Sequence, residues 1–514
     1  MAKVNFTTLT KLPMPDAPTP PKRPNILFLS VDQWGGPLFG YEGHPVIRTP
    51  TMDQLARLGT RFSRAYSESP ICIPARRSMM TGQSPRRHGD RSFLPALTMP
   101  NEHLLAQCMR AGGYQTVAIG KLHVFPQRDR IGFESTLLAE EGRPGLGAVD
   151  DYDLYLADQG QAGQQFMHGM SNNGYEHRSW HLDEALHVTN WITRTAAREI
   201  KRRDPNCPAF WHVSYTHPHP PLVPLASYEA LYQESSIDLP VMADWSRQPE
   251  ADLPMALQVV RDYWPARWSE AEHRSLRRAY YALCTHIDHQ VRILIGTLRE
   301  EGLLNDTVIL LTADHGDMLG DHGLWAKRLF YEGSARVPMV LVGAQCGPRI
   351  ASGAVDDRLV GLQDVMPTLL EVAGLPVPAS VEGLSMLGDQ RRAVLFGECG
   401  EGRNASRMLH DGRYKLIWYP GGQVVQLFDL ETDPRECRDL SRDPAASAVR
   451  ERLEAALVAQ LYGSDLEWVR DGRLVGYASD GSRIAPDRQL SGQRGVHYPQ
   501  PPVDHPDRTA IRPA

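Results

Sequence analysis

Two nearly continuous apolar runs, each ending on charged residues, are the clearest pattern along the chain. The first is NILFLSVDQ at residues 25–33, and the second is TVILLTADH at residues 307–315. A run of this kind, without polar alternation, is typical of a parallel strand that is buried on both faces. We therefore predict two central strands, with Asp32 and the pair Asp314-His315 at their ends.

Segments with helical spacing lie between the apolar runs. In TPTMDQLARLGTRF, residues 49–62, Thr51 is expected to cap a helix and Gly59 to end it. Residues 270–302 are expected to form a long amphipathic helix. Strands that alternate with helices indicate an α/β fold with a largely parallel sheet. Because ligands bind beyond the carboxyl ends of such strands, the charged residues that follow both runs are expected at one site.

The pattern changes after about residue 385. The segments VLFGE, SRMLHDGRYKLIWYP and QLFDLETDPRE predict short antiparallel strands joined by Asp-Gly and Gly-Gly turns, and a helical segment follows at 448–461. We therefore expect four parts: an N-terminal arm (1–23), a catalytic domain (24–385), a C-terminal subdomain (386–470) and a Pro-rich tail (471–514). The tail is expected to be disordered or to contact a neighbouring subunit, which favours a homo-oligomer.

Net charge, apolar runs and cysteine content indicate which partners and which compartment to expect. The formal net charge of −6 predicts no general affinity for nucleic acid or an anionic membrane surface. The first residues lack the apolar core of a secretory signal, and no apolar run is long enough to span a membrane. The seven cysteines are scattered and form no CxxC pair. That usage favours a reducing compartment, so a cytoplasmic location is expected.

A cysteine-centred segment carries the strongest functional signal. In CIPARRSMMTG, residues 72–82, the cysteine is followed by a proline two residues later and an arginine four residues later. Other segments are PNILFLSVDQ, GKLH (120–123), THPHPP (216–221), ADHGDMLGDHGLWAK (313–327), RVPMVLVG (336–343), DGRYKLIWY and LFDLETDPRE. In this order they resemble the formylglycine-dependent type I sulfatases over about residues 24–460. The resemblance implies an alkaline-phosphatase-like fold, with a large mixed sheet flanked by helices and a small C-terminal antiparallel sheet-and-helix subdomain.

The resemblance also implies a modified residue and a metal ion. Cys72 would be oxidised to formylglycine by a formylglycine-generating enzyme, and its hydrate would supply the nucleophile. The implied metal ligands are Asp32, Gln33, residue 72, Asp314 and His315. Imidazole suits transition metals better than calcium, so we expect Mn²⁺, with Ca²⁺ or Mg²⁺ as alternatives. Taken singly, Asp32 and the pair Asp314-His315 are equally well explained by strand-end capping and surface charge.

Four further side chains are implied around the transferred group. Arg76 would hold the diol, and Lys121 and Lys327 would grip the substrate oxygens. His123 would be the base that collapses the covalent intermediate.

The segment THPHPP offers two histidines for the leaving-group side. His219 would protonate the leaving oxygen or hold the substrate, and His217 is a competing candidate for substrate binding. Histidines in a Pro-rich loop also serve purely structural roles, so the choice between the two stays open.

Two departures from the family pattern bear on the substrate. Most sulfatases carry a second Asp where Gln33 stands, whereas phosphonate monoester hydrolases of the same family carry VDQ and CxPAR, as this chain does. Those hydrolases carry a Tyr/Thr pair in place of Lys121 and His123, and GKLH is the sulfatase form. The family often has an Asn shortly after the His-Gly at 88–89, where this chain has Ser92 or Phe93.

We therefore predict hydrolysis of a small-molecule aryl or alkyl sulfate monoester, with side activity on phosphonate monoesters or phosphodiesters. Lys121 and His123 decide this prediction because they would touch the transferring group. The first alternative is a phosphonate monoester hydrolase or phosphodiesterase. A second alternative is an unmatured metal-binding relative that acts by interaction, although complete GKLH and DHG motifs with Lys327 argue against it.

Overall fold

The computed structural model of the chain describes residues 23–141, 149–170, 173–249, 252–264 and 268–478. Its centre is a sheet with the strand order β4-β3-β5-β1-β6-β7-β2-β8, in which only β7 runs antiparallel to its neighbours. The strands are β1 (Asn25–Asp32), β2 (Thr60–Tyr66), β3 (Gln115–Gly120), β4 (Ser135–Leu138), β5 (Ala209–Pro218), β6 (Thr307–Ala313), β7 (Met339–Val342) and β8 (Ala354–Gly361). The predicted large mixed, mostly parallel sheet is confirmed.

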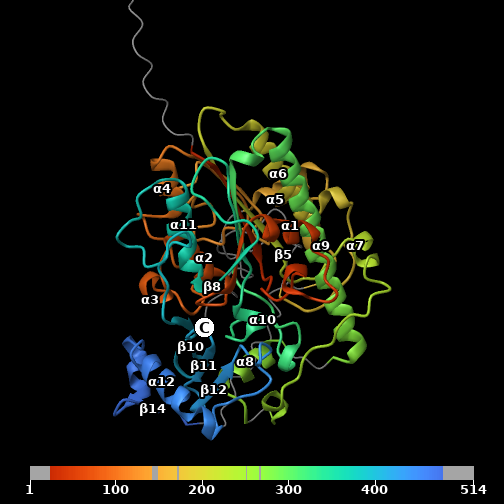
Figure 1. Cartoon of the computed structure of the whole chain (residues 1–514). Coiled ribbons are helices and arrows are strands. Elements are labelled where there is room, and N and C mark those ends of the chain that lie inside the picture. Colours follow the sequence, from red (N-terminus) through yellow and green to blue (C-terminus); the bar gives the residue numbers. More distant parts are fainter. Residues whose placement is uncertain (1–22, 142–148, 171–172, 250–251, 265–267, 479–514) are drawn as a thin grey trace, which may run out of the picture.

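Helices cover both faces of this sheet (Figure 1). Helices α6 and α9 pack together against β5, while α2, α4 and α11 pack together on the other side. The helices of the domain are α1 (Pro50–Leu58), α2 (Cys72–Thr81), α3 (Pro85–His88), α4 (Leu105–Ala111), α5 (Asp151–Asp158), α6 (Val188–Arg202), α7 (Ala226–Ala230), α8 (Met255–Tyr263), α9 (Glu270–Glu300), α10 (Glu332–Ala335) and α11 (Val365–Val372). Burial on both faces explains why β1, β5 and β6 are buried along their whole length.

The predicted cap of the first helix is wrong. Helix α1 begins at Pro50, with Thr49 at its N-cap position, so Thr51 lies inside the first turn. Proline favours the first helical position because its missing N–H would have no partner there. The predicted end at Gly59 is confirmed, and the long amphipathic helix is α9.

A second, four-stranded antiparallel sheet follows α11, in the order β12-β11-β10-β9. Its strands are β9 (Leu395–Cys399), β10 (Ser406–His410), β11 (Tyr414–Tyr419) and β12 (Val424–Asp429), and helix α12 (Ser447–Val458) packs against β10 and β11. These elements gather at the lower end of the molecule in Figure 1. The predicted antiparallel subdomain is confirmed, and the proposed boundary at residue 385 falls between α11 and β9.

The ends of the chain lie partly outside the described residues. The arm up to residue 22 and the tail from residue 479 are outside, and with them the predicted oligomer contact. Residues 471–478 belong to the folded body: β14 (Arg473–Leu474) pairs with β13 (Val469–Arg470), and Tyr477 bonds to the β11–β12 turn. None of the described helices is long and apolar enough to cross a bilayer. The cytoplasmic location stays a prediction.

Candidate active site

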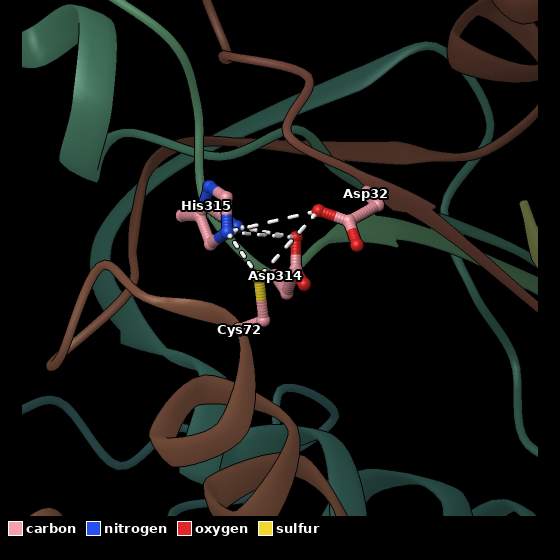
Figure 2. Close-up of side chains that lie close together, drawn as sticks. All are labelled: Asp32, Cys72, Asp314 and His315. Atoms are coloured by element: carbon pink, nitrogen blue, oxygen red, sulfur yellow. Dashed lines mark hydrogen bonds and ion pairs between the residues drawn. The ribbon is translucent and has the colours of Figure 1, made fainter. Parts of the chain in front are cut away.

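The ends of β1 and β6 bring the predicted metal ligands together. These strands are parallel neighbours, with Val31 opposite Ala313, so Asp32 and Asp314 emerge side by side at one edge of the sheet. Figure 2 shows Asp32, Asp314 and His315 converging on Cys72, the first residue of α2. One ligand atom from each of the four lies within 4.8 Å of the others, and all four residues are buried.

The spacing of these atoms fits a single metal ion. The Sγ atom of Cys72 lies 3.2 Å from Nε2 of His315 and 3.9 Å from Oδ1 of Asp32. Nε2 of His315 lies 3.7 Å from an oxygen of each aspartate. Ligands bound at about 2.0–2.6 Å to one ion lie at such separations from one another. Two carboxylates, one imidazole and an oxygen at position 72 would form a mixed oxygen–nitrogen site of the kind that Mn²⁺ accepts.

Positive side chains surround the two aspartates. The Arg76 guanidinium donates to Asp314 at 2.9 Å and lies 3.5 Å from Asp32. The Lys121 ammonium donates to the second oxygen of Asp32. Burial alone would raise the pKa of Asp32, but the charges of Lys121, His219, Arg76 and Lys327 hold it well below its ordinary value. The aspartate is therefore kept in the ionised form that metal binding requires.

Lys327 and Gln33 form the side of the site next to Cys72. The Lys327 ammonium donates to Oε1 of Gln33 at 2.7 Å and lies 3.4 Å from Sγ of Cys72. The amide nitrogen of Gln33 donates to Asp317 at 2.7 Å and to the Tyr175 hydroxyl at 2.8 Å. The carbonyl end of Gln33 thus points toward the Lys327 ammonium, and its role as a metal ligand stays a prediction.

Two glutamates that were not predicted as site residues contact the predicted catalytic segments. Glu141 accepts a hydrogen bond from Lys121 at 3.0 Å and lies 3.3 Å from Nδ1 of His219. Glu140 accepts from the backbone N–H groups of Leu122 and His123. Asp32 and Asp314 were predicted because polar residues that follow a parallel strand lie at the ligand-binding edge of the sheet. Both glutamates follow β4, so the same reasoning applies to them.

The three predicted histidines other than His315 lie around the same centre. His123 and Arg76 line one small cavity of about 10 Å³. His217 and His219 line a second cavity, of about 40 Å³, with Glu141. The ring of His217 bonds to the backbone carbonyl of His219, and the ring of His219 bonds to that of Pro220. Burial lowers the pKa of His217 to about 4.

Comparisons with known proteins show which family the chain resembles. Residues 24–375 match the family model "Sulfatase", and residues 320–462 match "N-sulphoglucosamine sulphohydrolase, C-terminal". An arylsulfatase of Clostridium perfringens is 33% identical over 88% of this chain and 98% of its own length. A choline-sulfatase of Rhizobium meliloti is 31% identical over 84% of this chain and 85% of its own length.

Solved structures show the same fold. The phosphonate monoester hydrolase of Agrobacterium radiobacter has a TM-score of 0.72 at 23% identity, covering 88% of this chain and 100% of that one. A 2-O GAG sulfatase has a TM-score of 0.67 at 21% identity, covering 90% and 99%. The predicted alkaline-phosphatase-like architecture is therefore confirmed. With its matched domain, its relatives and its motifs, the chain belongs to the sulfatase family.

Proposed function

We propose that this chain hydrolyses sulfate monoesters, as a sulfuric ester hydrolase, at the site around Cys72. The observation that carries the proposal is the buried convergence of Cys72 with Asp32, Asp314 and His315, with two lysine ammonium groups beside them. A nucleophile, an anionic metal site and cations for the sulfate oxygens are the parts that such hydrolysis needs.

Position 72 and a bound metal ion would act together. A divalent ion on these ligands supplies a Lewis acid that makes a hydroxyl of hydrated formylglycine at position 72 more acidic. Conversion of Cys72 requires a formylglycine-generating enzyme as a maturation partner. Because Cys72 is only 2% exposed, we expect this conversion before the chain has folded.

The chain's own cations position the sulfate group. Lys327 lies against the position-72 atom, and Lys121 lies on the far side of Asp32, so the two ammonium groups flank the reacting centre. Arg76 bonds to the aspartates and to the hydroxyl of Ser214, which keeps the ligand carboxylates in place. Positive groups aimed at oxygens that gain charge in the transition state are usually the largest catalytic contribution.

We assign the leaving-group side to His219. Its Nδ1 atom bonds to the Pro220 carbonyl and lies 3.3 Å from Glu141, the carboxylate that also accepts from Lys121. His217 supports this arrangement through its bond to the His219 carbonyl and lines the same cavity, where it would contact the substrate. His123 stays our proposal for the base that collapses the intermediate.

One aryl alcohol presented in three ways tests the reaction type. We expect kcat/KM for a 4-nitrophenyl sulfate to exceed that for the matching phenylphosphonate monoester and phosphate diester. The Cys72→Ala variant, prepared in parallel, sets the background for each substrate. If the phosphonate or the diester leads, the chain is a phosphonate monoester hydrolase or phosphodiesterase, the alternative that Gln33 favours.

Loading with metal is expected to raise stability, and Mn²⁺ to do so most. Without the ion, the carboxylates of Asp32 and Asp314 lie close together and lack the two positive charges that it would add. An ion at 100 times its Kd stabilises the folded state by about 2.7 kcal/mol. Thermal unfolding of chelator-treated protein with added Mn²⁺, Ca²⁺ or Mg²⁺ measures this shift. A larger rise in Tm with Ca²⁺ than with Mn²⁺ would overturn the assignment, and Asp314→Ala should abolish the rise.

A further inference from the structure

Phe93 and Arg328 form a platform beside the active site. The Phe93 ring meets the His123 ring edge to face, with 5.8 Å between their centroids. The Arg328 guanidinium lies 5.8 Å from the centroid of the same Phe93 ring. Arg328 directly follows Lys327, and its backbone N–H donates to Pro70, two residues before Cys72. The platform therefore contacts both His123, the expected base, and the backbone just before Cys72, the expected nucleophile.

The N–H groups of the Arg328 side chain are available to a ligand. Arg76 and Lys121 are each bonded to buried carboxylates of the site. No carboxylate among the described residues lies within ion-pair distance of Arg328, and its guanidinium makes no hydrogen bond to any of them. Its side chain is half-buried. A planar, permanently charged group with five N–H donors, partly open to solvent, is suited to bind a carboxylate or sulfate.

The fold holds both residues in a costly backbone conformation. Phe93 has φ = 69° and Arg328 has φ = 76°, in the left-handed region that bulky side chains rarely adopt. Such a residue is strained and persists only where the surroundings fix it. Here Asp90 accepts from the N–H groups of Ser92 and Leu94, which fixes the turn around Phe93.

A buried ion cluster anchors the same turn to the C-terminal subdomain. Arg91 donates to Glu398 on β9, to Glu401, and to both oxygens of Asp465 in the short helix Gly463–Trp468. Phe93 is therefore placed by two subdomains together. Hydrogen bonds hold both the turn that carries Phe93 and the Arg91 cluster that anchors it. The position of Phe93 is therefore fixed.

We propose that this platform binds a second anionic group, carried by the alcohol portion of the sulfate ester. Phe93 would pack against the ring or chain of the alcohol, while Arg328 would bond to its carboxylate or second sulfate. The proposal rests on the sulfatase activity proposed above and names a substrate class for it. Hydrogen bonds between a guanidinium and an anion are about twice as strong as those between neutral groups, and this difference would separate anionic from neutral alcohols.

The test compares matched aryl sulfates. The anionic substrates carry a carboxylate meta or para to the sulfate ester, and the neutral substrates carry a carboxamide at the same positions. For the wild-type protein, we expect kcat/KM for the better of the two carboxylate isomers to exceed that for the carboxamide at the same position by about tenfold, mainly through a lower KM. The Arg328→Gln variant should lose this preference, and Arg328→Lys should restore part of it. The readout is the ratio between the two substrates, so the intrinsic reactivity of each ester cancels between enzymes.

Arg349→Gln is the matched control. Arg349 is an exposed arginine with no ion pair to the described residues, and it follows β7, whose last residues pair with the middle of β6. It therefore lies at the sheet edge opposite the active site, and its loss should leave the ratio unchanged. An equal ratio in wild-type protein and Arg328→Gln would overturn the platform, as would an equal fall in Arg349→Gln.

Binding separates failure of the platform from failure of the sulfatase assignment. If no sulfate ester is hydrolysed, the sulfatase proposal fails, and calorimetry with two non-hydrolysable sulfonates still tests the platform. We expect 4-sulfobenzoate to bind about tenfold more tightly than 4-acetylbenzenesulfonate, and Arg328→Gln to remove the difference. Equal affinities in wild-type protein would refute the platform. Sulfate ester turnover without preference would refute the platform alone.

Discussion

The Cys72→Ala variant is expected to lose at least about 10⁴-fold in kcat/KM for aryl sulfates, because removal of a catalytic nucleophile typically has effects of this size. Cys72 is the first residue of α2, and its side chain points into the cluster of Asp32, Asp314 and His315 (Figure 2). Alanine leaves these ligands in place, so circular dichroism and Tm should change little. Steady-state kinetics on metal-loaded protein measures the loss.

The Cys72→Ser variant sharpens this prediction. A serine hydroxyl can attack the sulfate once, but it lacks the second hydroxyl that expels inorganic sulfate from a geminal diol. We expect single-turnover behaviour, with one sulfuryl group retained per chain in the intact mass. Multiple turnovers by Cys72→Ser, at a rate near that of the wild-type protein, would refute a formylglycine nucleophile.

The state of residue 72 in the native host tests the non-catalytic alternative. Conversion replaces the thiol by an aldehyde, which peptide mass spectrometry detects directly. An unmodified Cys72, together with aryl sulfate turnover no faster than that of the Cys72→Ala variant, would identify an unmatured relative that acts by interaction.

The sheet and the convergence of Asp32, Asp314 and His315 were predictable because their signals are local. The runs at 25–32 and 307–313 lack polar alternation, as buried parallel strands require, and both are central strands in the structure. Residues that follow neighbouring parallel strands lie at the same edge of the sheet, so Asp32 and the pair Asp314-His315 could be expected close together. The wrong cap at Thr51 shows the limit of such signals, since Thr49, Pro50 and Thr51 all suit a helix start.

The partners that orient the site were not predictable in the same way. Tyr175 bonds to Asp317 and Gln33, yet 142 residues separate it from each of them. Glu141 follows β4 and His219 follows β5. The two side chains meet because the strand order places β4 and β5 on either side of β3. Such pairings depend on strand order and on the path of long connections. No periodicity or motif in one sequence records them.

The C-terminal subdomain is joined to the active-site turn by the least predictable contact of all. Asp465 lies 374 residues from Arg91 in sequence, and it accepts hydrogen bonds from both Arg91 and Arg407. The side chains of Asp465 and Arg407 are fully buried, and that of Arg91 is 9% exposed. Asp465 is therefore shared by two guanidinium groups that water scarcely reaches; Arg91 also pairs with Glu398 and Glu401, whereas Arg407 pairs with Asp465.

The Asp465→Ala variant is accordingly expected to lose about 3–5 kcal/mol in the free energy of unfolding, because its removal leaves the buried guanidinium of Arg407 without its ion-pair partner. Glu401→Ala is the control: Glu401 also bonds to Arg91 through both oxygens, but its side chain is 51% exposed, so its loss should cost under about 1 kcal/mol. Urea unfolding of both variants measures the difference. A cost for Asp465→Ala as small as that for Glu401→Ala would mean that water replaces the carboxylate. The turn that carries Phe93 would then be held to the C-terminal subdomain by the bonds of Arg91 to Glu398 and Glu401.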